Sequence, residues 1–341
     1  MLISIAILFA CLILFLITLF VTGRVLFDHL AAWFGRIKIG RWDSRGQWRK
    51  AVETKARKYL HGKLQVQSGN YQSWQTGGLL LGLDDSDAEK YASAHPGLFL
   101  KGASDVETSF LAFALKQRSQ LPLGKEEELR SRLLKKLAQG TLPYRDSSSD
   151  PRYVDTIGLA CPFLYSTGLS EAADNQIVEY DRALYDGVFP PHAFDTERNL
   201  PMGVYDWARG TGWYILGIIS SRSNESRVIK LAKRMMDFQR KDGSFGAFLF
   251  NPSSRKESSG TVLAGILLVT AYKWSGDERF LSAAKKAENA LMTMTRRDGS
   301  VDFAQGDTIG IGLYSTHFGT MPFVQGMTLY LSGLIDSALL T

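Results

Sequence analysis

Residues 205–214, YDWARGTGWY, place an acid, a guanidinium and two indoles next to one another, directly before a wholly apolar run. If the segment is helical, Trp207, Arg209 and Trp213 lie in its first turns, beside backbone N–H groups without partners in the helix. Aromatic faces stack on sugar rings, and an arginine can hold a carboxylate through two hydrogen bonds. A buried helix with an Asp206 cap and core tryptophans explains the same segment. The choice between a binding site and a purely structural helix therefore depends on the other helices.

Asp155 is the first choice for an acid catalyst. The apolar segment 153–163 holds Asp155 and no other carboxylate or amine. Burial disfavours the charged form of a carboxyl group, so we expect the pKa of Asp155 to rise and the group to be a proton donor near neutral pH. Asp105 is the natural second acid, with Glu107 and Asp206 as alternatives.

Further polar and aromatic residues recur at the amino ends of the more apolar candidate helices. They are Gln72, Trp74 and Gln75; Asp105 and Glu107; Asp155; Asp206, Trp207 and Arg209; and Ser258, Ser259 and Thr261. If these helices run parallel, their amino ends meet at one mouth and form an acidic, aromatic-lined cavity, which suits a carbohydrate. His192 lies in a loop that could fold over this mouth. Taken singly, such an Asp or Ser is more often an N-cap, Trp74 a core residue and His192 a surface residue.

Apolar residues recur at helical spacing from position 47 onward, over twelve candidate helices. Odd members such as 125–138 are charged with one apolar stripe, whereas even members such as 258–275 are nearly charge-free and rich in glycine. This alternation predicts an all-α, closed (α/α)6 barrel with an inner and an outer ring; an α-solenoid would also alternate, but no fixed-period repeat is present. Strand-like pieces at 244–248 and 300–303 predict loop hairpins over one rim. The predicted helices are 47–62, 72–84, 86–94, 104–118, 125–138, 153–167, 170–187, 206–220, 223–240, 258–275, 277–296 and 322–338.

The chain begins with a hydrophobic run. Residues 2–22 carry no charged side chain, and about 20 apolar residues are enough for a helix to span a bilayer. The run is longer than a signal-peptide core, and no small-residue cleavage site follows it. We therefore predict a retained transmembrane anchor at 1–23, a basic and aromatic juxtamembrane segment at 24–46, and a single barrel domain at 47–341.

Charges beside this run predict its orientation. Seven Lys or Arg residues lie between positions 24 and 50, and none precedes the run. The positive-inside rule then places the barrel on the cytoplasmic side of the inner membrane, with the periplasm as the alternative. Trp33, Phe34, Trp42 and Trp48 lie among these cations, so we expect them to form an interfacial collar or to pack on the domain.

Composition narrows the classes of function. The net charge is +6 and the pI about 9.1, but no helix-turn-helix, zinc-finger or RNA-recognition pattern accompanies the excess, so we expect no nucleic-acid partner. Cys11 and Cys161 lie in two separate apolar segments, which argues against an intrachain disulfide. The five histidines lack metal-ligand spacing, so no zinc site is predicted.

Several motifs resemble those of the unsaturated glucuronyl and rhamnogalacturonyl hydrolases, glycoside hydrolase families 88 and 105, over residues 50–340. WARGTGW following YVDT is the specific part of this resemblance, whereas SGDERFL is common in helical barrels. The sequence departs from the family pattern at 104–107, where two acids compete, and at 322–326. The matching motifs are WQTGGL at 74–79, YVDT at 153–156 with Pro162, His192 with Asp195, WARGTGW at 207–213, SGT at 259–261 and SGDERFL at 275–281.

This resemblance implies a six-hairpin enzyme that hydrates the double bond of a 4,5-unsaturated uronic acid. An acid protonates C4, water adds at C5, and the resulting hemiketal opens and releases the sugar, without a metal or an organic cofactor. Asp155 would be the general acid and base, and Asp105 the second acid. His192, Trp207, Arg209 and Trp213 match positions that line the sugar pocket in these families, and Trp74 is a further candidate for binding the sugar. By this resemblance, Arg209 would either help to hold a substrate carboxylate or orient Asp155.

Three functions stay open at this point. The first is a membrane-anchored hydrolase of uronic-acid-containing oligosaccharides. The second is a glycosidase or sugar epimerase that acts on saturated sugars. The third is a barrel without catalysis that binds polysaccharide, or scaffolds envelope-polysaccharide assembly, at the membrane; the predicted anchor motivates it.

Overall fold

The helices of the barrel follow the predicted order. The computed structural model describes residues 9, 11–19, 23, 39–62, 72–99, 102–138, 142–144 and 151–340. Within these ranges, every predicted helix is present. Their bounds are α2 (Arg45–His61), α3 (Gln72–Gly82), α4 (Asp85–Ala94), α5 (Asp105–Gln117), α6 (Lys125–Leu137), α7 (Val154–Ser166), α8 (Ser170–Asp181), α9 (Ala208–Ile218), α10 (Glu225–Phe238), α11 (Ser258–Ser275), α12 (Glu278–Thr293) and α13 (Pro322–Leu339).

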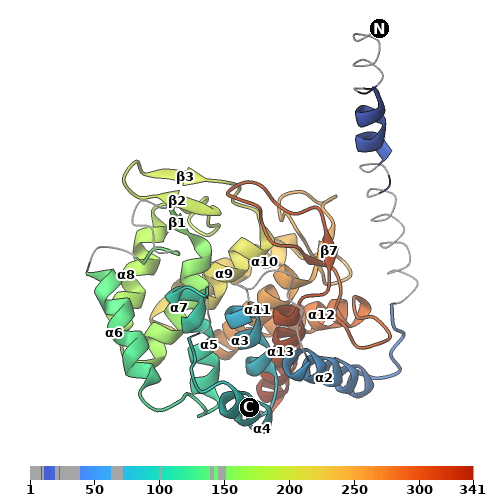
Figure 1. The fold of residues 1–341 in the computed structure, drawn as a ribbon. Coiled ribbons are helices and arrows are strands. Elements are labelled where there is room, and N and C mark those ends of the chain that lie inside the picture. Colours follow the sequence, from blue (N-terminus) through green and yellow to red (C-terminus); the bar gives the residue numbers. More distant parts are fainter. Residues whose placement is uncertain are drawn as a thin grey trace.

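Alternate helices close into a ring. α3, α5, α7, α9, α11 and α13 each pack against the next, and α13 packs back against α3 (Figure 1). The remaining helices cover this ring from outside, as α8 covers α7 and α12 covers α11. All residues of α9 are buried, whereas α6 buries only Leu129 and Leu133. The structure is therefore a closed double ring, and the solenoid alternative is wrong because the last inner helix contacts the first.

Glycine allows the first and last inner helices to touch. A Cβ atom added at Gly82 of α3 would lie 2.0 Å from the carbonyl oxygen of Gly326 in α13. A Cβ atom added at Gly326 would lie 2.1 Å from the carbonyl oxygen of Gly78. No side chain fits at such a separation, so the two backbones are in direct contact. The glycines that mark the apolar helices in the sequence serve this close packing.

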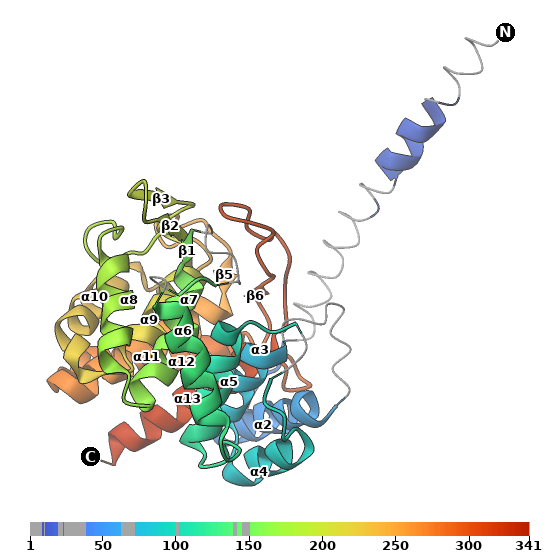
Figure 2. The same cartoon turned by 60° about the vertical axis from the view of Figure 1, so that its left-hand side comes forward.

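Three small antiparallel sheets lie at one end of the barrel (Figures 1 and 2). β1, β5 and β7 each precede an inner helix by no more than a short turn, so the amino ends of α7, α11 and α13 share this rim. The predicted hairpin near 244–248 is confirmed, whereas the piece at 300–303 contributes only one bridge, from Val301 to Thr295. The sheets are β1 (Arg152–Tyr153) with β2 (Ala193–Asp195) and β3 (Leu200–Met202), β4 (Phe245–Gly246) with β5 (Lys256–Glu257), and β6 (Ala304–Gln305) with β7 (Phe318–Gly319).

The first turns of α2 pack against the C-terminal part of the barrel. Trp48 is 1% exposed, and its indole N–H donates to the Thr295 hydroxyl at 2.8 Å. Arg45 pairs with Glu288 at 2.8 Å and with Asp336 at 2.6 Å. An interfacial collar is therefore wrong for Trp48, because the domain buries that ring.

Most of the predicted anchor lies outside the described residues, as do Trp33 and Phe34. Residues 11–19 are helical and exposed. Among the described residues, none of the helices has both the length and the apolar character needed to cross a membrane.

Replacement of Gly326 by alanine tests the contact that closes the ring. The new methyl group would meet the backbone of α3, so we expect a loss of about 1–3 kcal/mol in the free energy of unfolding. Gly333 of the same helix has open space around its Cα, so Gly333→Ala should gain about 0.5–1 kcal/mol through helix propensity. Urea unfolding measures both variants. Equal midpoints for the two would contradict direct backbone contact at Gly326.

Candidate active site

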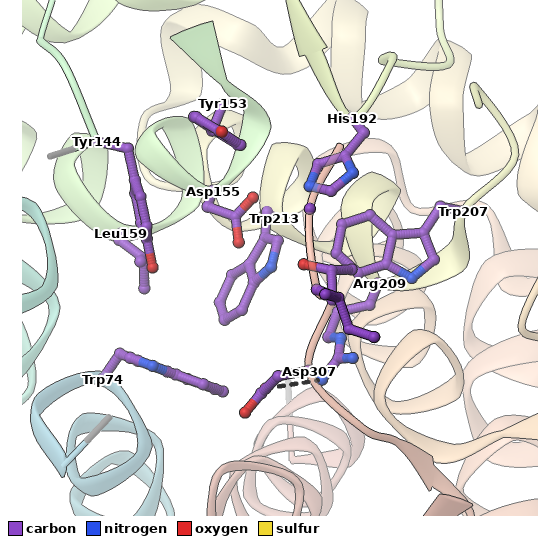
Figure 3. A pocket seen from close by; sticks show the side chains of 13 residues that line it. Trp74, Tyr144, Tyr153, Asp155, Leu159, His192, Trp207, Arg209, Trp213 and Asp307 are labelled. Atoms are coloured by element: carbon purple, nitrogen blue, oxygen red, sulfur yellow. Dashed lines mark ion pairs between the residues drawn. The ribbon is translucent and has the colours of Figure 1, made fainter. Parts of the chain in front are cut away.

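A cavity of about 160 Å³ opens at the rim where the inner helices begin. It brings together six of the seven predicted site residues, all except Asp105 (Figure 3). The amino ends of three inner helices, α3, α7 and α9, therefore do converge, as their polar residues indicate. The cavity is lined by Trp74 of α3, Tyr144, Tyr153, Asp155 and Leu159 of the α7 region, His192, Trp207, Arg209 and Trp213 of the α9 region, and residues 307–310 of the loop between β6 and β7.

Asp155 is the buried acid of this cavity. It is the second residue of α7, and its Oδ2 atom is buried with no hydrogen-bond partner among the described residues. Removal from water raises the pKa of Asp155 from 3.8 to about 6; nearby Arg209 opposes this rise, and the carboxylates of Asp307 and Glu107 add to it. The carboxyl group is therefore mainly protonated below pH 6 and can donate its proton to a ligand.

Arg209 is the only cation among the described residues that line the cavity. Its side chain is 3% exposed, and its Nη2 atom donates to the carbonyl oxygen of Gly306 at 2.6 Å. Its Nη1 atom lies 4.0 Å from Asp307 Oδ1, and its guanidinium carbon lies 5.5 Å from the centre of the Trp207 ring. These partners satisfy a charge that would be costly to bury alone.

Two groups of rings form the walls. Trp74 meets Trp213 edge to face at 5.4 Å between ring centres, and Phe323 lies 5.3 and 5.1 Å from them. On the other side, Trp207 lies 4.7 Å from His192 and 5.2 Å from Tyr314. Each ring is fixed by its neighbours, so the cavity presents rigid apolar surfaces of the kind on which a sugar ring can stack.

His192 enters the wall as a neutral group. Burial, and to a smaller extent the charge of Arg209, lowers its pKa from 6.5 to about 4. Its Nδ1 atom is buried without a hydrogen-bond partner among the described residues, so it can bond a ligand. Its carbonyl oxygen accepts from the N–H of Val154 at 3.0 Å, which ties the loop of His192 to the helix of Asp155.

Asp105 does not reach the cavity. Its carboxylate is held between Arg132 and Lys136 of α6, each at 2.6 Å, and is 3% exposed. As the first residue of α5, it points to the outer helix instead of the mouth. The prediction of Asp105 as a cavity acid is therefore not met, because two cations of α6 hold it outside.

The other two candidate acids also have structural partners. Glu107 accepts the backbone N–H of Ser104 at 2.8 Å, and Tyr144, which lines the cavity, donates its hydroxyl to Glu107 at 3.4 Å. Glu107 is thus behind the cavity wall. Asp206 accepts the N–H of Phe250 at 3.2 Å and lies outside the lining residues.

The polar start of α11 is structural. Glu257 is fully buried and is the N-cap, accepting the N–H and hydroxyl of Ser259 at 3.0 and 2.6 Å. Thr261 accepts the N–H of Phe245 at 3.0 Å. These side chains hold β4 and the loop after β6 in place, so the prediction that they face the mouth is wrong. None of Asp105, Asp155, Asp206 and Ser258 is an N-cap; the caps of these helices are Ser104, Tyr153, Trp207 and Glu257.

Apart from single residues such as Tyr144, the part of the site that the sequence analysis does not predict is the loop from Gly306 to Gly310. It supplies Asp307 to the cavity, and Ile309 at its tip is 87% exposed. The segment GDTIGIG has neither helical nor strand periodicity, and only its glycines mark it. Within the described ranges, no three His, Cys, Asp or Glu side chains form a metal-ligating group.

Comparisons with known proteins bear on this fold. Family models gave no match to this sequence, and neither did the curated proteins. A possible member of the GH105 family from Salmonella enterica superposes with a TM-score of 0.73 at 15% identity, over 88% of this chain and 95% of that one. An unsaturated glucuronyl hydrolase specific for heparin gives 0.69 at 13% identity, over 86% and 98%.

An unsaturated glucuronyl hydrolase from Bacillus sp. GL1, responsible for the degradation of glycosaminoglycan, gives a TM-score of 0.57 at 17% identity, over 85% of this chain and 96% of that one. Structural neighbours therefore come from the families whose motifs this sequence resembles. At such low identity the likeness shows a shared fold, and the activity has to be argued from the cavity.

The pH dependence of the free energy of unfolding should show that Asp155 is buried in the folded protein. Between pH 4 and 6 the folded protein binds more protons than the unfolded chain, so the wild type loses stability as the pH rises through this range. Asp155→Asn removes this loss and should be more stable above pH 6 by up to about 3 kcal/mol. Chemical unfolding at pH 4.5 and 7.5 measures the difference.

Asp105→Asn is the matched control, because it also lies in the first turn of an inner helix. Loss of two ion pairs should lower its stability at both pH values. A similar loss in both variants would show that Asp155 is not held in an unfavourable environment.

Proposed function

We propose that this protein is a glycoside hydrolase that acts on uronic-acid-containing oligosaccharides by hydrating a terminal 4,5-unsaturated uronyl residue. The observation that carries this proposal is a buried Asp155, whose pKa burial raises to about 6, facing a cavity with aromatic walls and one buried arginine. The described neighbours include unsaturated glucuronyl hydrolases, which supports the same substrate class.

The reaction requires a proton on carbon. The double bond of such a uronide is an enol ether, so protonation at C4 leaves a cation that the ring oxygen shares at C5. Asp155 can donate this proton because its carboxyl group is mainly neutral below pH 6. A water molecule then adds to C5, and the Asp155 carboxylate takes up the proton that this water loses. Asp155 is then protonated again. The hemiketal at C5 opens by breaking the bond from C5 to the ring oxygen, which leaves a hemiacetal at C1. Collapse of this hemiacetal to an aldehyde breaks the glycosidic bond and releases the sugar.

The other groups of the cavity position the sugar. Trp74 and Trp213 offer apolar surface to the ring, and His192 offers a neutral hydrogen-bonding nitrogen. Arg209 supplies positive charge for the uronate carboxylate. Since the sugar leaves from a hemiacetal at C1 after the ring has opened, no second strong acid in the cavity is needed to protonate the leaving group. This agrees with the absence of Asp105 from the lining residues.

Turnover in two Asp→Asn variants tests the proposal. Lyase-generated oligosaccharides lose their ultraviolet absorbance when the double bond is hydrated. The wild type should remove this absorbance, and Asp155→Asn should lower kcat at least about 10²-fold, the contribution of a general acid. Asp105→Asn should keep most of its kcat, because its carboxylate lies outside the cavity.

Two results would count against the proposal. A wild-type protein that leaves a broad panel of unsaturated uronides unchanged is not a hydrolase of this class. Full activity in Asp155→Asn would remove that residue from the mechanism. Mass analysis of the products distinguishes addition of water from isomerisation of a saturated sugar.

Attachment to the inner membrane through residues 1–23, with the barrel in the cytoplasm, is a further proposal from the sequence. Its support is the uncharged run at 2–22 and the cations that follow. A reporter that works only after export, fused to the C-terminus, should be inactive. Activity of this fusion would contradict the cytoplasmic side, and release of the full-length chain by a high-salt wash would contradict the anchor.

A further inference from the structure

The loop between β6 and β7 places a carboxylate next to the cation of the cavity. Asp307 points into the space between Trp74 and Arg209 (Figure 3). Its Oδ1 atom lies 4.0 Å from Arg209 Nη1, and its side chain is 44% exposed. This distance is too long for a hydrogen bond, so the two groups attract each other without a fixed geometry.

The guanidinium of Arg209 has capacity for a closer carboxylate. Nη2 donates to the carbonyl oxygen of Gly306 at 2.6 Å. Among the described residues, the polar partners of Nη1 are the sulfur of Met321, at 3.6 Å, and the distant Asp307. A thioether sulfur is a weak acceptor, whereas a carboxylate can bind a guanidinium through two short hydrogen bonds. A ligand carboxylate in the cavity would therefore be a better partner for Nη1 than either residue.

A uronate that approaches Arg209 meets the negative charge of Asp307 first. Two carboxylates that share one guanidinium repel each other. A neutral sugar meets no such repulsion. The charge of Asp307 thus weakens the binding of acidic sugars and does not affect the binding of neutral sugars.

We propose that Asp307 competes with the substrate carboxylate for Arg209 and thereby sets how strongly the cavity discriminates between acidic and neutral sugars. The choice of a uronic acid as ligand rests on the proposed function. The competition itself follows from the positions of Gly306, Asp307 and Met321 around one guanidinium. Asp307 is in this sense a specificity-determining residue, and it comes from the loop instead of the inner helices.

Binding of two sugars to three proteins tests this inference. Glucuronate and methyl glucoside are titrated calorimetrically into the full-chain wild type, Asp307→Asn and Glu197→Gln. Glu197 is an exposed acid in the β2–β3 turn, so its variant changes the net charge equally without entering the cavity. Asp307→Asn should lower the Kd for glucuronate about tenfold, the scale of one charge contact. Its Kd for methyl glucoside should stay within about twofold, and Glu197→Gln should resemble the wild type for both sugars.

Three outcomes would overturn the inference. An equal decrease in the Kd for glucuronate in Asp307→Asn and Glu197→Gln would show an effect of net charge alone. Weaker glucuronate binding in Asp307→Asn would show that Asp307 orients Arg209 for the ligand. An equal decrease in the Kd of Asp307→Asn for glucuronate and for methyl glucoside would show a steric effect of the loop.

Turnover of unsaturated uronides by the wild type is measured in parallel and separates the two proposals. Turnover without a change of selectivity in Asp307→Asn removes the role of Asp307 and leaves the hydrolase function. A change of selectivity without any turnover keeps the role of Asp307 and removes the hydrolase function.

Discussion

The first and last inner helices meet backbone to backbone, and the site depends on that contact. Gly78 and Gly82 of α3 face Gly326 of α13 at separations that exclude any side chain. Because this contact closes the ring, the amino ends of the inner helices are held around one rim and cannot spread along a solenoid. Trp74 of α3 and Trp213 of α9 can then share one aromatic wall, although about 140 residues separate them in the chain.

The buried carboxylate of Glu257 links the inner helices to the loop over the cavity mouth. Glu257 caps α11 and also accepts the N–H of Gln305 at 3.0 Å. Gln305 in turn accepts the indole N–H of Trp207 at 3.0 Å and donates to the carbonyl of Ser315 at 2.8 Å. Since an unpaired buried carboxylate is costly, these bonds fix the base of the loop relative to α9 and α11. Glu257 therefore acts on the cavity from a distance, through Gln305 and Trp207.

Helices and the acid could be predicted because burial leaves a mark on sequence. Inner helices are apolar on every side, and a single Asp155 in such a segment has to lie at a special position. Turns leave weaker marks: α8 ends at Asp181, six residues before the predicted end, and Asp186 and Gly187 adopt left-handed conformations in the segment that follows. The direction in which a side chain points within a helical turn leaves almost no mark on the sequence. Asp105 faces α6 and Glu107 faces Tyr144, two positions later in the same turn.

The loop with Gly306 and Asp307, which the sequence predicts least well, affects the pKa of Asp155, the residue that it predicts best. Arg209 lowers the pKa of Asp155, so a close pair between them would favour the carboxylate and remove the proton donor. The carbonyl of Gly306 takes the Nη2 donor of Arg209, Asp307 lies beside Nη1, and Asp155 Oδ2 has no partner within the described chain. Asp307 also raises the pKa of Asp155 directly. Burial is the main cause of the raised pKa of Asp155, and the loop that lacks any periodic signal adds to it, because it holds the only cation of the described lining in another interaction.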